Sequence, residues 1–213
     1  MKKSAIVLIV LGVLLFGVLV VALSIGGAYN GMVSKSQAAD QAWAQVQNDY
    51  QRRADLIPNL VATVKGAANF ESSTLEAVTT ARASVGQVKI DANNAPTDAA
   101  QLAAYQKAQD GLSSALSRLL VVSENYPTLK ATANFRDLQA QLEGTENRIT
   151  VARRDFNTAI QTYNTAVKQF PGVLLAGMFG FAPKPYFEAV AGSEVAPKVN
   201  FDSGPAPAAA TKP

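Results

Sequence analysis

The sequence predicts an all-α protein, in which an N-terminal transmembrane helix precedes an antiparallel four-helix bundle with long helices. Residues 5–28 are almost wholly apolar, and no charged side chain occurs from Ser4 to Ser34. Beyond residue 29, apolar residues recur at spacings of three, four and seven, which is typical of helices that bury one face. No stretch of residues 29–170 alternates apolar and polar residues as a half-buried strand does.

The apolar segment has the length of a membrane span. As a helix it is about 36 Å long, and the hydrocarbon core of a bilayer is about 30 Å thick. Lys2 and Lys3 before an apolar run also resemble a secretory signal, but typical signal cores have only about 7–15 residues. Gly26 and Ala28 are small enough to precede a cleavage site, so cleavage stays an alternative. We expect an uncleaved signal-anchor over residues 1–28.

The distribution of cations predicts the orientation. Lys2, Lys3 and the terminal amine precede the span, whereas Lys35 is the only cation close behind it. Because positive charge stays on the cytoplasmic side, the N-terminus is predicted to be cytoplasmic and the bundle external, or periplasmic. Arg52 and Arg53 lie further along and weaken the contrast. The predicted location is the cell inner (plasma) membrane, crossed once.

The first bundle helix is predicted from Met32 onward, and the pattern allows it to continue directly out of the span. Pro58 interrupts it, because proline removes one helical hydrogen bond at a cost of about 3 kcal/mol. Asp55 could cap a restarted helix with the proline in its first turn. We therefore expect a kink or short break at residues 56–58. The core stripe of this helix comprises Trp43, Val46, Tyr50, Ile57, Val61, Val64 and Ala68.

A second helix is predicted over residues 72–88. Ser73 and Glu76 fit a capping box, in which the side chain at each position bonds the backbone of the other. Residues 91–98 then form a loop by composition, because they are rich in Asp, Asn and Pro.

A third helix is predicted over residues 98–123, where Thr97 or Asp98 caps its start. Pro127 ends it, because a proline disfavours helical geometry at the preceding Tyr126.

The fourth helix has the clearest pattern and closes the bundle, which we assign to residues 29–170. Pro171 and Gly172 end it. The 3–4 spacing favours coiled-coil-like packing between neighbouring helices. Its stripe comprises Phe135, Leu138, Leu142, Ile149, Phe156, Ile160, Tyr163, Val167 and Phe170.

The segment that follows is apolar but interrupted by glycine and proline, so it is too short to span a bilayer. Either it folds back to cover the bundle, or residues 170–187 form an exposed apolar patch that meets lipid or a partner. We assign residues 171–202 to this C-terminal segment and residues 203–213 to a disordered Pro/Ala-rich tail. The predicted contact residues are Val173, Leu174, Leu175, Met178, Phe179 and Phe181.

Composition excludes several kinds of chemistry. The chain has no cysteine and no histidine, so thiol nucleophiles, disulfides, zinc fingers and a Ser–His–Asp triad are excluded. Two of the 19 basic residues, Lys2 and Lys3, precede the span, and the remaining 17 nearly balance the 16 acidic residues. We therefore expect no nucleic-acid surface, no enzymatic activity and no cofactor. Glu143 and Glu146 could hold a hard cation, but a solvated helix face is preferred and no metal site is predicted.

Polar residues beside the proline and on other helices suggest a buried network within the bundle. A carboxylate and a guanidinium can pair through two hydrogen bonds, but burying them is costly unless every partner is present. The alternative is that most of these charges are solvated on the surface. No catalytic role is predicted for them. The candidate network comprises Arg52, Arg53, Asp55, Glu124, Asn147 and Arg154.

Several ordered motifs resemble the LemA family, over roughly Tyr29 to Phe187. One departure is Asn69-Phe70-Glu71, which stands where the family usually shows a His-Glu pair. The motifs are RRADLIPNLVATVKG at residues 52–66, ENYPTLK at 124–130, LQAQLEGTENRI at 138–149 and ARR at 152–154.

The resemblance implies a bacterial protein with one N-terminal membrane helix and an α-helical bundle. No enzymatic activity is established for the family, some relatives are tied to membrane-organelle formation, and others are encoded near envelope proteases. We expect a non-enzymatic interaction or scaffold protein at the bacterial cell envelope, which contacts a second copy or other envelope proteins. The alternative is an envelope ligand- or lipid-binding module that uses residues 170–187. Small side chains that favour self-association are Ala99, Ala100, Ala103, Ala104 and Ala108.

Overall fold

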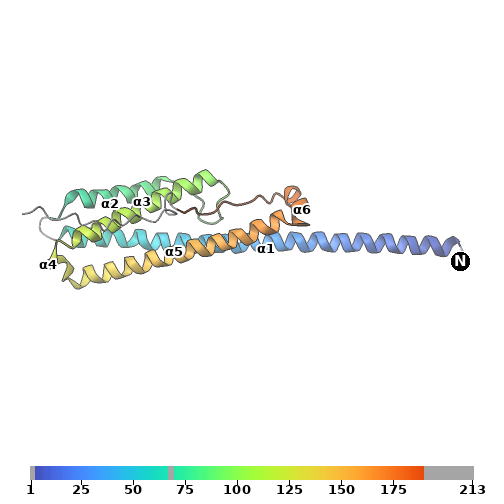
Figure 1. The fold of residues 1–213 in the computed structure, drawn as a ribbon, viewed down its shortest axis with the longest axis horizontal. Helices are drawn as coiled ribbons and strands as arrows, with labels where there is room; N and C mark the ends of the chain where they lie inside the picture. Colours follow the sequence, from blue (N-terminus) through green and yellow to red (C-terminus); the bar gives the residue numbers. More distant parts are fainter. Residues whose placement is uncertain (1–2, 67–69, 190–213) are drawn as a thin grey trace, which may run out of the picture.

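The computed structural model describes residues 3–66 and 70–189, and these residues form helices without any strand (Figure 1). The predicted all-α class is therefore confirmed. The predictions for the end of the C-terminal segment and for the 203–213 tail concern residues outside the described ranges. The helices are α1 (Lys3–Lys65), α2 (Ser72–Gln87), α3 (Ala99–Ser123), α4 (Pro127–Lys130), α5 (Ala133–Lys168) and α6 (Gly172–Phe179).

The helices form a long rod around α1, whose N-terminal part projects alone from the bundle (Figure 1). Helix α5 runs antiparallel to the second half of α1, and the α2–α3 hairpin packs beside them over the half that is farther from the N-terminus. We call the end where α1 leaves the bundle the proximal end, and the end where α4 lies the distal end. Helix α6 lies at the proximal end.

Helix α1 is continuous from Lys3 to Lys65, so a short break at residues 56–58 is wrong, whereas a kink there stays a prediction. Pro58 lies inside the helix with its side chain exposed, whereas Ile57 and Leu60 on either side are buried. The lost hydrogen bond therefore falls on the solvent face. Apolar burial of the flanking residues holds the helix together across the proline.

The helix starts differ from the sequence predictions in one case and agree in another. At the start of α2, Glu71 is the N-cap and its side chain makes no cap hydrogen bond, so the capping box between Ser73 and Glu76 is wrong. Asp98 caps α3 as predicted, because its carboxylate accepts hydrogen bonds from the backbone N–H groups of Ala100 and Gln101.

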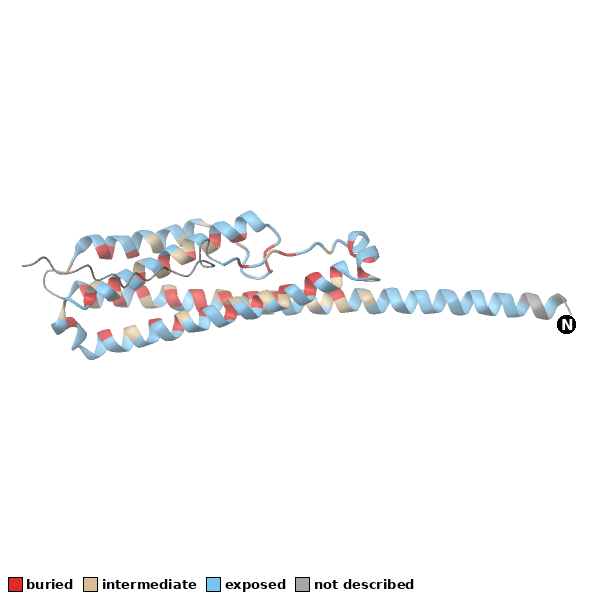
Figure 2. Cartoon of the chain, viewed as in Figure 1, coloured by how far each residue is buried: buried red, intermediate tan, exposed pale blue. Residues whose placement is uncertain are grey.

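The bundle buries three apolar clusters along its length, and Figure 2 shows the buried side chains following the helix interfaces. A distal cluster gathers around Leu60, Leu119 and Phe135. A middle cluster surrounds Trp43, which is fully buried. A small proximal cluster comprises Met32, Tyr163, Val167, Leu175 and Ala176. Most residues of the predicted stripes lie in or against these clusters. Phe170 was wrongly placed in a stripe, because it is 80% exposed, and Ala68 lies outside the described residues.

Two short helices were not predicted. Helix α4 begins with Pro127 in its first turn, a position that suits proline. The sequence pattern predicted Pro127 only as the end of the preceding helix. Helix α6 begins at Gly172, where a Cβ atom would lie 2.1 Å from the carbonyl oxygen of Ala166. It ends at Gly180, whose φ of 77° is the left-handed conformation that favours glycine. Glycine therefore shapes both ends of α6.

Candidate functional site

The projecting part of α1 is the first candidate site. Its large apolar side chains from Leu8 to Leu23 are exposed, and Figure 2 shows this part of the helix free of packing. By length and composition, it is the one helix among the described residues that could cross a membrane. Exposed apolar side chains over such a length favour lipid over water.

Helix α6 packs against α1 where this apolar part ends. The ring of Tyr29 makes edge-on contacts with Phe179 and Phe181, with centroid distances of 5.0 and 5.7 Å. Met32, one turn later on α1, packs in the proximal cluster with Leu175 of α6. Since Tyr is favoured at membrane interfaces, these contacts place α6 at the level where a span would meet the headgroups.

The six predicted contact residues divide between two environments. Leu175 is buried against the bundle and Phe181 is half-buried, so part of the segment folds back as the first alternative expects. The other four stay exposed, as the second alternative expects, and Phe170 before them is 80% exposed. These exposed residues are Val173, Leu174, Met178 and Phe179.

Residues 181–188, which we call the strap, run back from α6 along the bundle without forming a helix. Three side-chain amides hold it, and each one both donates to the C=O and accepts from the N–H of a single strap residue, at 2.7 to 3.1 Å. The pairs are Asn164 with Lys184, Asn157 with Phe187, and Gln106 with Glu188. The amides therefore replace the backbone partners that a strand would have in a sheet.

Two strap side chains are buried as well. The Phe187 ring lies 5.3 Å from the ring of Phe156 and 6.1 Å from that of Trp43. The Lys184 ammonium pairs with the Asp40 carboxylate at 2.9 Å, and both side chains are largely buried. The strap thus adds Phe187 to the middle cluster, which also contains Leu102 and Tyr105 from the start of α3.

A layer of charged and polar side chains crosses the bundle between the distal and middle clusters. Arg53 of α1 is fully buried and donates to the Glu146 carboxylate of α5 at 2.8 Å. It also donates to the Ser113 hydroxyl and to the side-chain and backbone oxygens of Gln109, both on α3. One buried cation therefore ties three helices together. Its Nε atom is buried without a hydrogen-bond partner.

A second arginine extends this polar layer. Arg153 of α5 donates to the Tyr50 hydroxyl at 2.7 Å and to the Asp110 carboxylate at 2.8 Å. The guanidinium groups of Arg53 and Arg153 both lie over the Tyr50 ring, at 5.3 and 5.5 Å from its centroid. Burial raises the pKa of the Tyr50 hydroxyl from 10.0 to about 12, although both arginines act in the opposite direction. The layer has two cations and two carboxylates, so its charges balance.

The structure brings one of the six candidate network residues, Arg53, into this layer. The remaining five side chains are exposed, because the helix faces that carry them point to solvent. Of these, Asp55 bonds Gln51 and Arg154 pairs with the adjacent Asp155. The exposed five are Arg52, Asp55, Glu124, Asn147 and Arg154.

Sequence reasoning missed the partners of Arg53. Gln109 and Ser113 are uncharged, so they were not considered as partners of a buried arginine. Glu146 was considered only as a ligand for a cation. Their spacing held a usable signal, because Gln109 falls in the core stripe of α3, three residues before Leu112. A polar residue in a core stripe points to a buried hydrogen-bond partner.

The described part of the chain contains no group of three or more Asp or Glu residues arranged to hold a metal ion. A surface cavity of about 290 Å³ lies between α1 and α5, around Gln45, Asp49 and Val151. The proximal end presents exposed apolar side chains, and the helical bundle extends beyond it.

The bundle and the segment after it match a known family, since residues 42–201 fit the family model of LemA. The chain belongs to the LemA family. Curated LemA-like relatives include magnetosome proteins MamQ 1 and MamQ 2 of Paramagnetospirillum magneticum, each 36% identical over 81 residues, and MamQ of Magnetospirillum gryphiswaldense, 35% identical over 80 residues. These alignments cover 38% of this chain but only 29 to 30% of the relatives.

The polar layer of this LemA-family bundle predicts a contrast between two adjacent arginines. Arg53→Ala should lower the free energy of unfolding by about 3 kcal/mol, because it leaves Gln109, Ser113 and Glu146 without their donor. Arg52→Ala should change it by less than about 0.5 kcal/mol, because Arg52 is exposed. Urea unfolding measures both values. Equal effects would contradict a structural role for the layer.

Tyr50 predicts a loss of stability at high pH. Its folded-state pKa of about 12 exceeds the ordinary 10.0, so folding favours the protonated hydroxyl. The resulting stabilisation, about 3 kcal/mol, is present below pH 10 and is lost as the pH rises through 12.

Urea unfolding at pH values from 9 to 12 tests this linkage. The free energy of unfolding should fall less steeply for Tyr50→Phe than for wild type. A residual slope is expected from Tyr105, whose pKa is also raised by burial. Parallel pH profiles for the two proteins would contradict the assignment.

Proposed function

We propose that this protein is a membrane-anchored, non-enzymatic interaction or scaffold protein at the bacterial cell envelope. The observation that carries the proposal is the continuity of α1, which forms both the projecting apolar segment and the core of the bundle. A helix with no interruption transmits the position and direction of the anchor to the bundle. At 1.5 Å per residue, residues 29–65 hold the distal end about 55 Å from the membrane face.

The proposed location is the inner membrane, crossed once, with a cytoplasmic N-terminus and the bundle on the periplasmic side. The cations at Lys2 and Lys3 support this orientation. The matched relatives are named as magnetosome proteins and not as enzymes, which supports the non-enzymatic part of the proposal.

The proposed partners are a second copy of the chain or other envelope proteins. The start of α3 presents four exposed alanines, at Ala99, Ala100, Ala103 and Ala104. Small side chains let two helices approach closely. Attachment to a membrane raises the local concentration of such surfaces, so weak contacts suffice for assembly.

Disulfide crosslinking in native membranes tests this proposal, because the chain has no cysteine of its own. Ala103→Cys should give an intermolecular disulfide under mild oxidation, since it lies in the alanine surface. Thr150→Cys, exposed on α5, is the matched control and should stay monomeric. Chemical crosslinking with mass spectrometry on the same membranes detects other partners. A monomer in both experiments, with no crosslinked partner, would contradict a scaffold role.

A second candidate function is a module that binds an envelope ligand or lipid through residues 170–187. The exposed apolar side chains of α6 favour it. Within this segment Lys184 and Phe187 are already held by the bundle, so only the α6 part is free to bind.

A further inference from the structure

We propose that α6 is a second membrane-contacting element, which lies in the interface of the bilayer that α1 crosses and which anionic phospholipid headgroups hold there. The inference rests on the proposed membrane anchoring and adds a second point of attachment. One spanning helix leaves a rod free to tilt, whereas a span plus an interfacial helix constrains its angle to the membrane.

The position of α6 along α1 gives the first argument. Its Phe179 and the following Phe181 contact Tyr29, the first residue beyond the apolar span. A bilayer around residues 5–28 would therefore reach α6 at the headgroup level. Figure 2 shows α6 at the end of the bundle from which the exposed part of α1 projects.

The side chains of α6 give the second argument. The helix GVLLAGMF carries no polar or charged side chain. Leu174 and Met178, one turn apart, are 63% and 78% exposed, and Phe170 just before the helix is 80% exposed. The same helix buries Leu175 and Ala176 against the bundle, so its exposed face is held outward by packing. An apolar face of this kind suits the boundary between headgroups and acyl chains.

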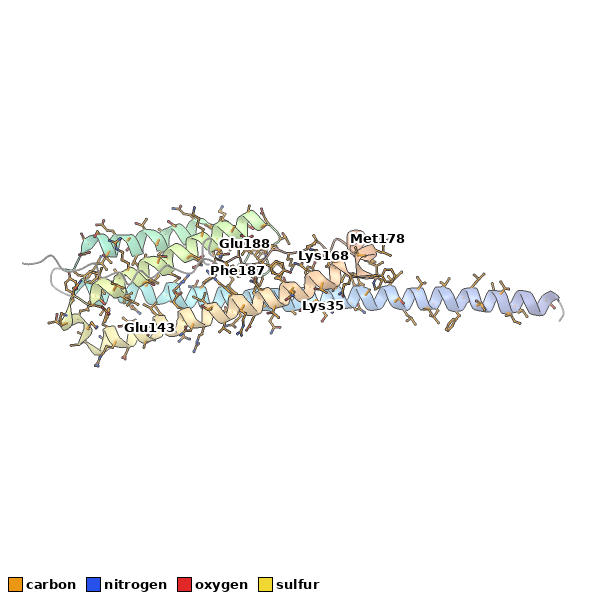
Figure 3. All side chains as sticks on the ribbon, viewed as in Figure 1. Lys35, Glu143, Lys168, Met178, Phe187 and Glu188 are labelled. Atoms are coloured by element: carbon orange, nitrogen blue, oxygen red, sulfur yellow. The ribbon has the colours of Figure 1, made fainter. Side chains whose placement is uncertain are left out.

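The charges at the proximal end give the third argument. No Asp or Glu occurs from residue 3 to 39 or from residue 156 to 187, and the nearest carboxylate, Asp40, already pairs with Lys184. Lys35 lines a groove with Gly172, the first residue of α6, and Lys168 is the last residue of α5 (both are labelled in Figure 3). Neither lysine forms an ion pair with another described residue. Two cations near an apolar helix are complementary to an anionic membrane surface.

A groove at the same level suits a lipid. It measures about 220 Å³ and separates α1 from the turn between α5 and α6. Gly27 and Gly31 line it on the side of the span, followed one turn later by Lys35, and Phe170 lines the opposite wall. The acyl chain of a phospholipid fits along Gly27 and Gly31, with the phosphate of the headgroup at Lys35. The polar residues that line the groove are Lys35 and Gln169, and the neighbouring exposed side chains of α6, Leu174 and Met178, are apolar. A cation beside an exposed apolar face favours an anionic lipid as the occupant.

Fluorescence of single-cysteine variants in vesicles tests the inference on the full-length protein. An environment-sensitive dye is placed at Met178→Cys on α6, and at Val121→Cys, an equally apolar exposed position at the distal end. A nitroxide lipid that quenches near the headgroups should quench the dye at residue 178 at least about twofold more than the dye at residue 121. Equal quenching at the two positions would overturn the inference.

A third dye, at Leu15→Cys in the span, separates this inference from the proposed function. Protection of residue 15 without lipid quenching at residue 178 would overturn the α6 contact alone. Exposure of residue 15 to an aqueous quencher would overturn the membrane anchoring itself. A dye at residue 178 that is shielded from the aqueous quencher but not quenched by lipid would indicate a protein occupant, which also overturns the inference.

The role of charge is tested by lipid composition. Quenching at residue 178 should be stronger in vesicles that contain phosphatidylglycerol than in phosphatidylcholine alone, and the double variant Lys35→Gln, Lys168→Gln should remove the difference. Equal quenching in both lipids would overturn the headgroup assignment.

Gly172→Ala provides a second variant that acts through packing. Its new Cβ must displace α6 from α5, because the carbonyl oxygen of Ala166 lies 2.1 Å away. Lipid quenching at residue 178 should change while protection at residue 15 stays the same. Circular dichroism verifies that the bundle is still folded, and an unchanged signal at residue 178 would overturn the position of α6.

Discussion

The structure depends on one constraint: a single helix must be stable both where it exposes apolar side chains and where it packs in the bundle. In its first part α1 exposes apolar side chains all around, and in its second part it buries one stripe against α5 and the α2–α3 hairpin. Helical hydrogen bonding within α1 satisfies the backbone in both settings, which no strand could do alone. Pro58 is tolerated because its missing bond faces water while Ile57 and Leu60 are buried. Everything else in the bundle is placed relative to this axis.

The elements packed on α1 divide the rod into regions with different interactions. The distal half is a four-helix bundle with an apolar core. On the proximal side of the Arg53 layer, the start of α3 and the strap pack together in the middle cluster, where side-chain amides and the burial of Phe187 hold the strap. The polar layer costs desolvation, which is offset because Arg53 finds hydrogen-bond partners on both α3 and α5. The proximal end then presents exposed apolar side chains together with Lys35 and Lys168, which form no ion pair within the described ranges.

Periodicity predicted the helices well because each one buries a single face. Trp43 in α1 and Phe156 in α5 lie in the core as their spacing indicated. Features that depend on tertiary neighbours were not accessible in the same way. The partners of Arg53 come from other helices. The break predicted at Pro58 did not take into account that Ile57 and Leu60 are buried against neighbouring helices. Asn157 and Asn164 hold an aperiodic strap, and α6 begins at a glycine whose role is a close approach to Ala166.

The central claim is that α1 connects anchor and bundle as one rigid helix. Spin labels at Ser24→Cys and Asn48→Cys, both exposed on α1, test it by pulsed electron resonance in lipid nanodiscs. A continuous helix predicts a narrow distance distribution near about 36 Å between the two backbone positions. A broad distribution, or one centred at a much shorter distance, would contradict a rigid connection and leave the bundle as a flexibly tethered domain.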